Sequence, residues 1–171
     1  MLFSTSCKDT TGNENDILKV CEEINNNMAN YKLVSMDGYP DPEKRKINAY
    51  FKDDQPKLLI QEYFGDSGRV ITHFYINKDQ LIYVLKEDFV YNMPSYLTED
   101  SAKAKGDTSW YDDKKTVLKT SYYFFAKNKL KKWVNENNAV ISDSSKLCTE
   151  MENQLVGDCL LMLKILKTKE D

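Results

Sequence analysis

Residues 46–91 have the sequence KINAYFKDDQPKLLIQEYFGDSGRVITHFYINKDQLIYVLKEDFVY. Short runs of aromatic and β-branched residues alternate here with polar turn residues, a pattern typical of strands joined by tight turns. Because the connections are too short for a crossover, neighbouring strands must be antiparallel. The stretch therefore predicts a sheet of hairpins, with strands near residues 47–52, 57–64, 69–76 and 80–91.

The same pattern returns later in the chain and predicts two more strands, near residues 116–126 and 130–135. A weak internal repeat supports the hairpins, because an aromatic pair is followed across a polar turn by a leucine at three places. The three copies are Tyr50-Phe51 with Leu58, Phe74-Tyr75 with Leu81, and Tyr123-Phe124 with Leu130. This repeat resembles those of many uncharacterised bacterial secreted and envelope proteins, a resemblance that implies no particular chemistry.

Two segments outside the strands carry apolar residues at steps of three and four, which predicts amphipathic helices. In residues 15–34 the apolar stripe is Ile17, Cys21, Ile24, Met28 and Tyr31. In residues 143–167 it is Cys148, Met151, Leu155, Cys159, Met162 and Leu166. The expected fold class is α+β: an antiparallel meander sheet of about six strands, with an N-terminal and a C-terminal helix packed on one face. Residues 14–171 are expected to form one domain, preceded by a tether at residues 1–13.

The first residues, Met1-Leu2-Phe3-Ser4-Thr5-Ser6-Cys7, resemble the end of a bacterial lipoprotein signal peptide. In that family, apolar and then small residues precede a cysteine that is lipidated. The resemblance implies lipidation of Cys7 and a location in the bacterial cell envelope, lipid-anchored or periplasmic. A polar segment suited to a tether follows as far as residue 15. The alternative is an N-terminus with an incidental cysteine, and then a cytoplasmic protein that truly starts at Met1.

The overall composition excludes several classes of function. The chain has 171 residues and a net charge of -3, and its basic residues are nearly all lysine. Such a balance gives no concentrated basic face for nucleic acid. No phosphate-binding loop or dinucleotide fingerprint is present, so no cofactor is expected. No apolar run is long enough to cross a bilayer, so contact with a membrane is expected only through a lipid anchor.

The sequence also offers little for catalysis or metal binding. His73 is the one histidine, and it lies mid-strand, where a solvent-facing position is expected. No nucleophile motif accompanies it, and the cysteines lack zinc-ligand spacing. The protein is therefore predicted not to be an enzyme and to have no metal site. A disulfide between Cys21 and either Cys148 or Cys159 is left open, with the pairing unknown, because it needs the two helices to lie side by side.

Two features favour binding instead. The predicted strands carry apolar residues on both sides, so one sheet face would remain open if both helices covered the other. The connection 93–115 is long and lacks periodicity, and such loops are usually functional. The candidate binding surface is Tyr63, Tyr75, Tyr96, Trp110, Tyr111 and Trp133. The alternatives for this surface are a second covering element, a dimer contact, tyrosines that are simply tolerated at the surface, or loop aromatics folded back over the sheet.

The leading hypothesis is thus a non-catalytic envelope lipoprotein that binds a protein partner through its open sheet face and the 93–115 loop. A sharper form is an immunity or inhibitor protein directed against a secreted toxin or hydrolase. The competing class is a carrier of a small apolar ligand, which needs a cavity of at least roughly 300 Å³. Neither the partner nor the oligomeric state follows from the sequence.

Overall fold

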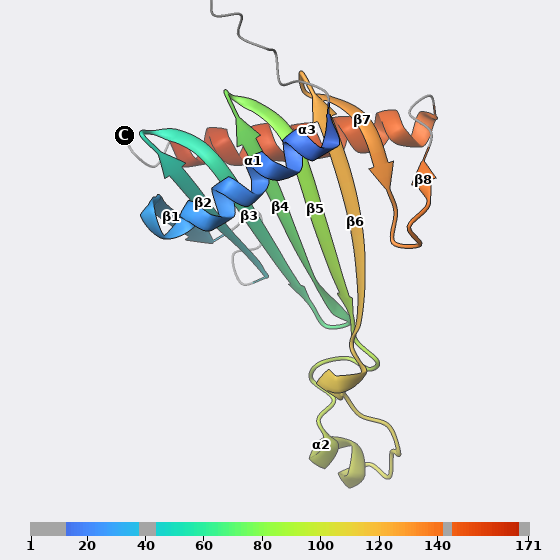
Figure 1. Cartoon of the computed structure of the whole chain (residues 1–171). Coiled ribbons are helices and arrows are strands. Elements are labelled where there is room, and N and C mark those ends of the chain that lie inside the picture. Colours follow the sequence, from blue (N-terminus) through green and yellow to red (C-terminus); the bar gives the residue numbers. More distant parts are fainter. Residues whose placement is uncertain (1–12, 38–43, 142–144, 168–171) are drawn as a thin grey trace, which may run out of the picture.

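The computed structural model describes residues 13–37, 44–141 and 145–167. These residues form an eight-stranded antiparallel sheet in which every strand pairs with its neighbours in the chain (Figure 1). The α+β class and the antiparallel meander are confirmed, whereas the expected number of strands, about six, is too low. The strands are β1 Lys32–Asp37, β2 Arg45–Lys52, β3 Gln55–Gly65, β4 Gly68–Asn77, β5 Gln80–Val90, β6 Val117–Ala126, β7 Lys129–Val134 and β8 Val140–Ile141.

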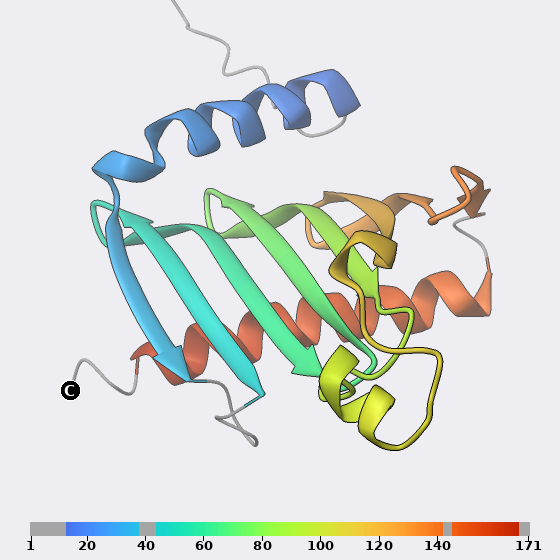
Figure 2. The ribbon, with the colours of Figure 1, turned by 90° about the horizontal axis from the view of Figure 1, so that it is seen from below.

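The two long helices lie on opposite faces of this sheet (Figure 2). Helix α1, Glu14–Asn27, packs with the core cluster that contains Leu58. Helix α3, Lys146–Lys167, packs with the cluster that contains Leu59. Since successive side chains of a strand point to opposite faces, these two leucines serve different helices. The expectation that both helices pack on one face is wrong. The strands are apolar on both sides because each face of the sheet packs against one helix.

Helix α1 is shorter than its sequence pattern predicted. It begins after the N-cap Asn13, whose side chain accepts from the Asn15 N–H, and it ends at Asn27. A turn of 3-10 helix, Met28–Asn30, then leads into β1. Strand β1 pairs with β2 over its whole length, so residues 32–34 are sheet and not helix. The apolar spacing continued past the helix because Met28 and Tyr31 still pack against the α1 cluster.

Three hairpin turns share one geometry at the same end of the sheet. The central residues are Asp53-Asp54, Lys78-Asp79 and Lys127-Asn128, and all six have positive φ. Two positive-φ residues in a two-residue loop are the signature of a type I′ turn, whose twist matches that of the flanking strands. Asp and Asn tolerate this conformation better than most residues.

The three hairpins also share a shift in strand register beside the turn. Register shifts occur at Tyr50/Phe51, Tyr75/Ile76 and Phe124/Phe125, each at the same distance before its turn. Across the turns, Phe51 pairs with Pro56, Ile76 with Leu81, and Phe125 with Leu130. The three hairpins are therefore equivalent, but Pro56 and not Leu58 is the counterpart of Leu81 and Leu130.

Strands β3 to β6 continue well past both helices (Figure 1). Strand β3 alone has 11 residues, which at about 3.4 Å per residue spans roughly 35 Å. We call the part beneath the helices the covered half and the part beyond them the projecting half. The connection between β5 and β6 extends from the tip of the projecting half and contains helix α2, Glu99–Ala104, and a 3-10 turn, Asp113–Lys115.

Candidate functional site

The projecting half carries a row of large side chains across four strands on the face that α1 covers elsewhere. Phe64 lies opposite Arg69, Arg69 opposite Phe89, and Phe89 opposite Leu118. We call these four residues the distal row. Phe64 and Leu118 are exposed, and Arg69 and Phe89 are half-buried. Because aromatic residues and arginine are enriched in protein interfaces, the row has the composition of a binding surface.

Arg69 occupies the centre of this row. Its guanidinium lies 4.4 Å from the centroid of the Phe89 ring, a cation–π contact. Its Nε atom is buried and has no hydrogen-bond partner among the described residues. A buried donor left without an acceptor costs free energy, so Arg69 is held in this position at some cost to stability.

One step nearer to α1, the same face becomes more polar. His73 Nε2 lies 3.2 Å from the Glu87 Oε2 on the neighbouring strand. Both side chains are partly exposed. His73 is thus a partly buried surface residue of the sheet, and the pair adds one polar contact beside the distal row.

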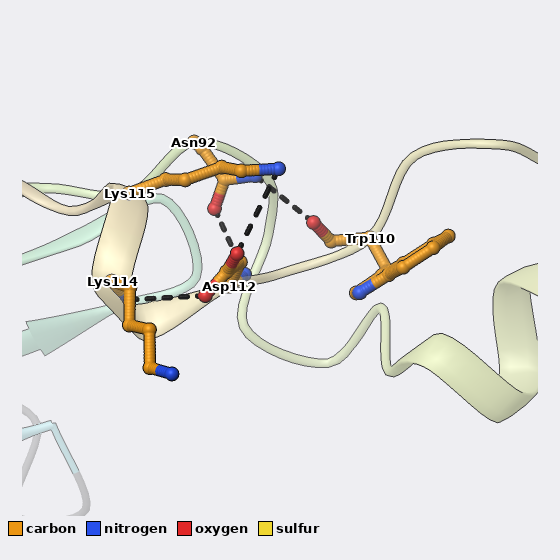
Figure 3. A network of polar contacts seen from close by, with 5 residues as sticks. All are labelled: Asn92, Trp110, Asp112, Lys114 and Lys115. Atoms are coloured by element: carbon orange, nitrogen blue, oxygen red, sulfur yellow. Dashed lines mark hydrogen bonds and ion pairs between the residues drawn. The ribbon is translucent and has the colours of Figure 1, made fainter.

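The β5–β6 connection packs on itself and does not fold back over the sheet. The Asn92 side chain joins its two ends, because Nδ2 donates to the Trp110 carbonyl at 2.9 Å and Oδ1 accepts from the Asp112 N–H at 3.0 Å (Figure 3). The rings of Tyr91 and Tyr111 are in contact, tilted at 60° to each other with centroids 4.9 Å apart. The loop is therefore a small folded unit at the tip of the projecting half.

The structure separates the six residues of the predicted binding surface. Tyr96 is 68% exposed on the loop, and Tyr63 is exposed on the face opposite the distal row, beneath the Arg45 guanidinium. Trp110 and Tyr111 are half-buried within the loop. Tyr75 and Trp133 are only 4% and 8% exposed, so their assignment to a binding surface is corrected: both are core residues. Alternation within a strand did not reveal this, because both faces are buried in the covered half.

The predicted cysteine chemistry is also resolved for three of the four thiols. Cys21, Cys148 and Cys159 are free and buried. Cys21 packs on the α1 face and the other two on the α3 face, so the sheet lies between the proposed disulfide partners. Burial raises the pKa of both Cys21 and Cys159 to about 12, which keeps them as unreactive thiols. Cys7, the predicted lipidation site, lies outside the described residues.

A second candidate site is a groove of about 530 Å³ at the opposite end of the sheet. It lies between the last turns of α3 and the corner formed by β1, β2 and the first two type I′ turns. Its apolar lining includes Val34, Phe51, Pro56, Leu160 and Leu163. Four charged residues complete the lining: Asp54, Asp79, Lys164 and Lys167.

Neither the distal row nor the groove was predicted as a site. The groove did leave a signal in the sequence, since Leu160 and Leu163 make the apolar stripe of α3 wider near its end than in its first turns. The distal row left a weaker one, Phe64 and Arg69 on either side of the 65–68 turn region. Which strand ends lie beyond the helices depends on tertiary structure and could not be predicted from local pattern.

No family model matches this chain, and no curated protein or solved structure matches it either. None of the described helices is long and apolar enough to span a bilayer. Within residues 13–37, 44–141 and 145–167, no three His, Cys, Asp or Glu side chains are grouped so as to hold a metal ion. The distal row and the groove are therefore the two candidate sites.

Proposed function

We propose that this protein acts by binding a protein partner, and that the partner contacts the distal row and the adjoining loop. The observation that supports this most is the exposure of Phe64 and Leu118 on the part of the sheet beyond both helices. Exposed apolar groups rimmed by polar ones are typical of interaction surfaces. Arg69, whose guanidinium lies over the Phe89 ring, is placed between them and can anchor an acceptor group on the partner.

One feature of the sequence favours an envelope location: Cys7 follows small residues and precedes a polar segment. We propose that Cys7 is lipidated and tethers the domain to a membrane, so that the projecting half meets partners outside the cytoplasm. An immunity or inhibitor protein is the sharper form of this proposal. Incorporation of an alkyne-tagged fatty acid tests the anchor, and Cys7→Ser should abolish labelling. Equal labelling of both proteins would contradict the anchor.

A photo-crosslinking experiment tests the binding surface. A photoreactive residue at Leu118 should give one defined adduct in cells of the protein's own species, and the same residue at Val140 should not. Val140 is the matched control because it is exposed on β8, away from the distal row. With the partner purified, Phe64→Ser combined with Leu118→Ser should weaken binding by roughly tenfold or more. Unchanged affinity in that double variant would refute the assignment of this surface.

A second function, the carriage of a small apolar ligand, is favoured by the groove. Its volume of about 530 Å³ exceeds the lower size expected of a ligand site, because such pockets occupy roughly 300–1,000 Å³. The groove and the distal row lie at opposite ends of the sheet, so the two functions are compatible and can be tested separately.

A further inference from the structure

The groove beneath the end of α3 has charges of opposite sign at its border. Asp54 and Asp79 come from two type I′ turns at the same end of the sheet. Lys164 and Lys167 come from the last turns of α3, three residues apart and hence on neighbouring positions of one helix side. The carboxylates are thus supplied by the sheet and the ammonium groups by the helix.

These four charges do not neutralise one another. Among the described residues, none of them belongs to an ion pair, although other lysines and carboxylates of the chain do pair. A ligand with a single charge would be attracted by one pair of residues and repelled by the other. A headgroup that carries both charges can place its cation by the aspartates and its anion by the lysines.

The interior of the groove is apolar between these charged positions. Phe51, Val34 and Leu163 are half-buried there, and Leu160 is 60% exposed at the opening. Exposed apolar area of this kind is removed from water when a hydrocarbon chain binds, and that burial is favourable. The lining therefore suits a flexible aliphatic chain, with polar contacts only at the charged border.

We propose that the groove binds a zwitterionic amphiphile with one hydrocarbon chain, the chemistry of a lysophospholipid. The chain lies along the apolar lining, and the headgroup lies between the aspartates and the lysines. This inference rests on the second function above, carriage of a small apolar ligand, and adds the class of headgroup. It is independent of the distal row.

Binding of dodecylphosphocholine to the full chain, measured by calorimetry below the micellar concentration, tests the proposal. We expect saturable binding of one molecule per chain, at least about tenfold tighter than that of laurate or dodecyltrimethylammonium. Phosphocholine without a chain should not bind. Tighter binding of laurate would overturn the headgroup assignment and leave ligand carriage intact, whereas no binding of any amphiphile would overturn both.

A matched pair of variants locates the site. Leu160→Lys places a charge in the apolar lining and should weaken dodecylphosphocholine binding by roughly tenfold or more. Leu161→Lys makes the same change at a neighbouring position, 52% exposed, that does not line the groove, and it should bind as the wild type does. Equal loss in both variants would overturn the site. Binding that develops only after removal of residues 168–171 would show that the chain's own end occupies the groove, and would overturn it as well.

Charge variants test the headgroup. Asp54→Asn with Asp79→Asn removes both carboxylates and keeps a residue type that tolerates the positive φ of these turns. The double variant should bind dodecylphosphocholine more weakly and laurate more tightly, since repulsion of an anion is removed. An unchanged preference between the two amphiphiles would contradict the role of the aspartates. Binding of the protein partner should be the same in these variants, which separates this test from that of the distal row.

Discussion

The covered and projecting halves of the sheet are made of the same strands but differ in what lies on their faces. In the covered half, α1 and α3 bury both sides, and Leu58 and Leu59 have no exposed surface at all. In the projecting half, Phe64 of the same strand is exposed, and no described helix lies over it. Strand pairing is continuous through both halves.

This difference shows that the strands of this fold remain hydrogen-bonded to one another even where their side chains are not buried by a helix. Backbone hydrogen bonds between β3, β4, β5 and β6 maintain the structure of the projecting half. Most of the apolar burial that stabilises the domain is in the covered half. A surface held in place by the sheet but not needed for the core is free to carry binding residues. Mutations should therefore have large effects on stability in one half and small ones in the other.

The largest expected effect is the difference between replacing a phenylalanine in the covered half and replacing one in the projecting half. Phe74 is fully buried against α3, and its replacement by alanine should lower the free energy of unfolding by about 3–5 kcal/mol. Phe89 is half-buried beneath Arg69, and Phe89→Ala should lower the free energy of unfolding by only about 1 kcal/mol. The substitution removes a partly exposed contact and a cation–π interaction. Urea denaturation of the two variants measures the difference. Equal losses would show that the halves are not distinct in packing.

An intermediate effect is expected at Glu152, which joins α3 to the start of β7. Its carboxylate accepts from the Lys129 Nζ at 2.9 Å and from the Leu130 N–H at 2.7 Å. The hydrogen bond from Lys129 is the main cause that holds the pKa of Glu152 below its usual range, although partial burial opposes it. Glu152→Gln should cost about 1 kcal/mol at neutral pH, since the amide is uncharged and has one acceptor oxygen for the two donors.

The destabilisation caused by Glu152→Gln should depend on pH, because the pKa of Glu152 is lowered in the folded protein. A carboxylate with a lowered folded-state pKa stabilises fully above its unfolded value, about 4.3, and the contribution is lost as the pH falls through the folded-state pKa. The difference between wild type and Glu152→Gln should therefore shrink in acid. Glu150→Gln is the control, because that exposed residue forms only a 3.5 Å surface pair with Lys146. A difference that persists at the same size in acid would contradict this explanation.

The strands and the α3 stripe were predictable because their signals are local. Aromatic runs between two-residue polar turns define hairpins almost alone, and each of the six predicted strands is present with small changes at its ends. The first residues of β1, 32–34, fall in the predicted helix because the apolar spacing of α1 continues through Met28 and Tyr31. β8, Val140–Ile141, is too short to leave a pattern.

The arrangement of the layers was not predictable by the same means. Apolar residues on both sides of a strand, such as Leu58 and Leu59, indicate that both faces are buried, but they do not say what buries them. The sequence pattern was compatible with two helices on one face and a partner on the other. The position of Tyr75 in the core follows from α1 lying on its face, where its hydroxyl donates to Asn25 Oδ1 at 3.1 Å.

The smallest expected effect on stability is at the tip of the projecting half, where local order can be lost without loss of global stability. Asn92→Ala removes both side-chain bonds that join the ends of the loop, to the Trp110 carbonyl and the Asp112 N–H. Because these groups lie outside the core, the free energy of unfolding should fall by less than about 1 kcal/mol. Hydrogen exchange at the Asp112 amide should nevertheless become much faster, since local opening no longer breaks that bond.

Thr108→Ala, at an exposed position of the same loop, is the matched control and should leave exchange at Asp112 unchanged. Exchange in β4 and β5 of the covered half should be the same in both variants, because their amides open only with the whole domain. If Asn92→Ala also accelerated exchange there, the loop would be part of the folding core. The separation between a stabilising half and a binding half would then fail, since its most distant element would be coupled to the buried one.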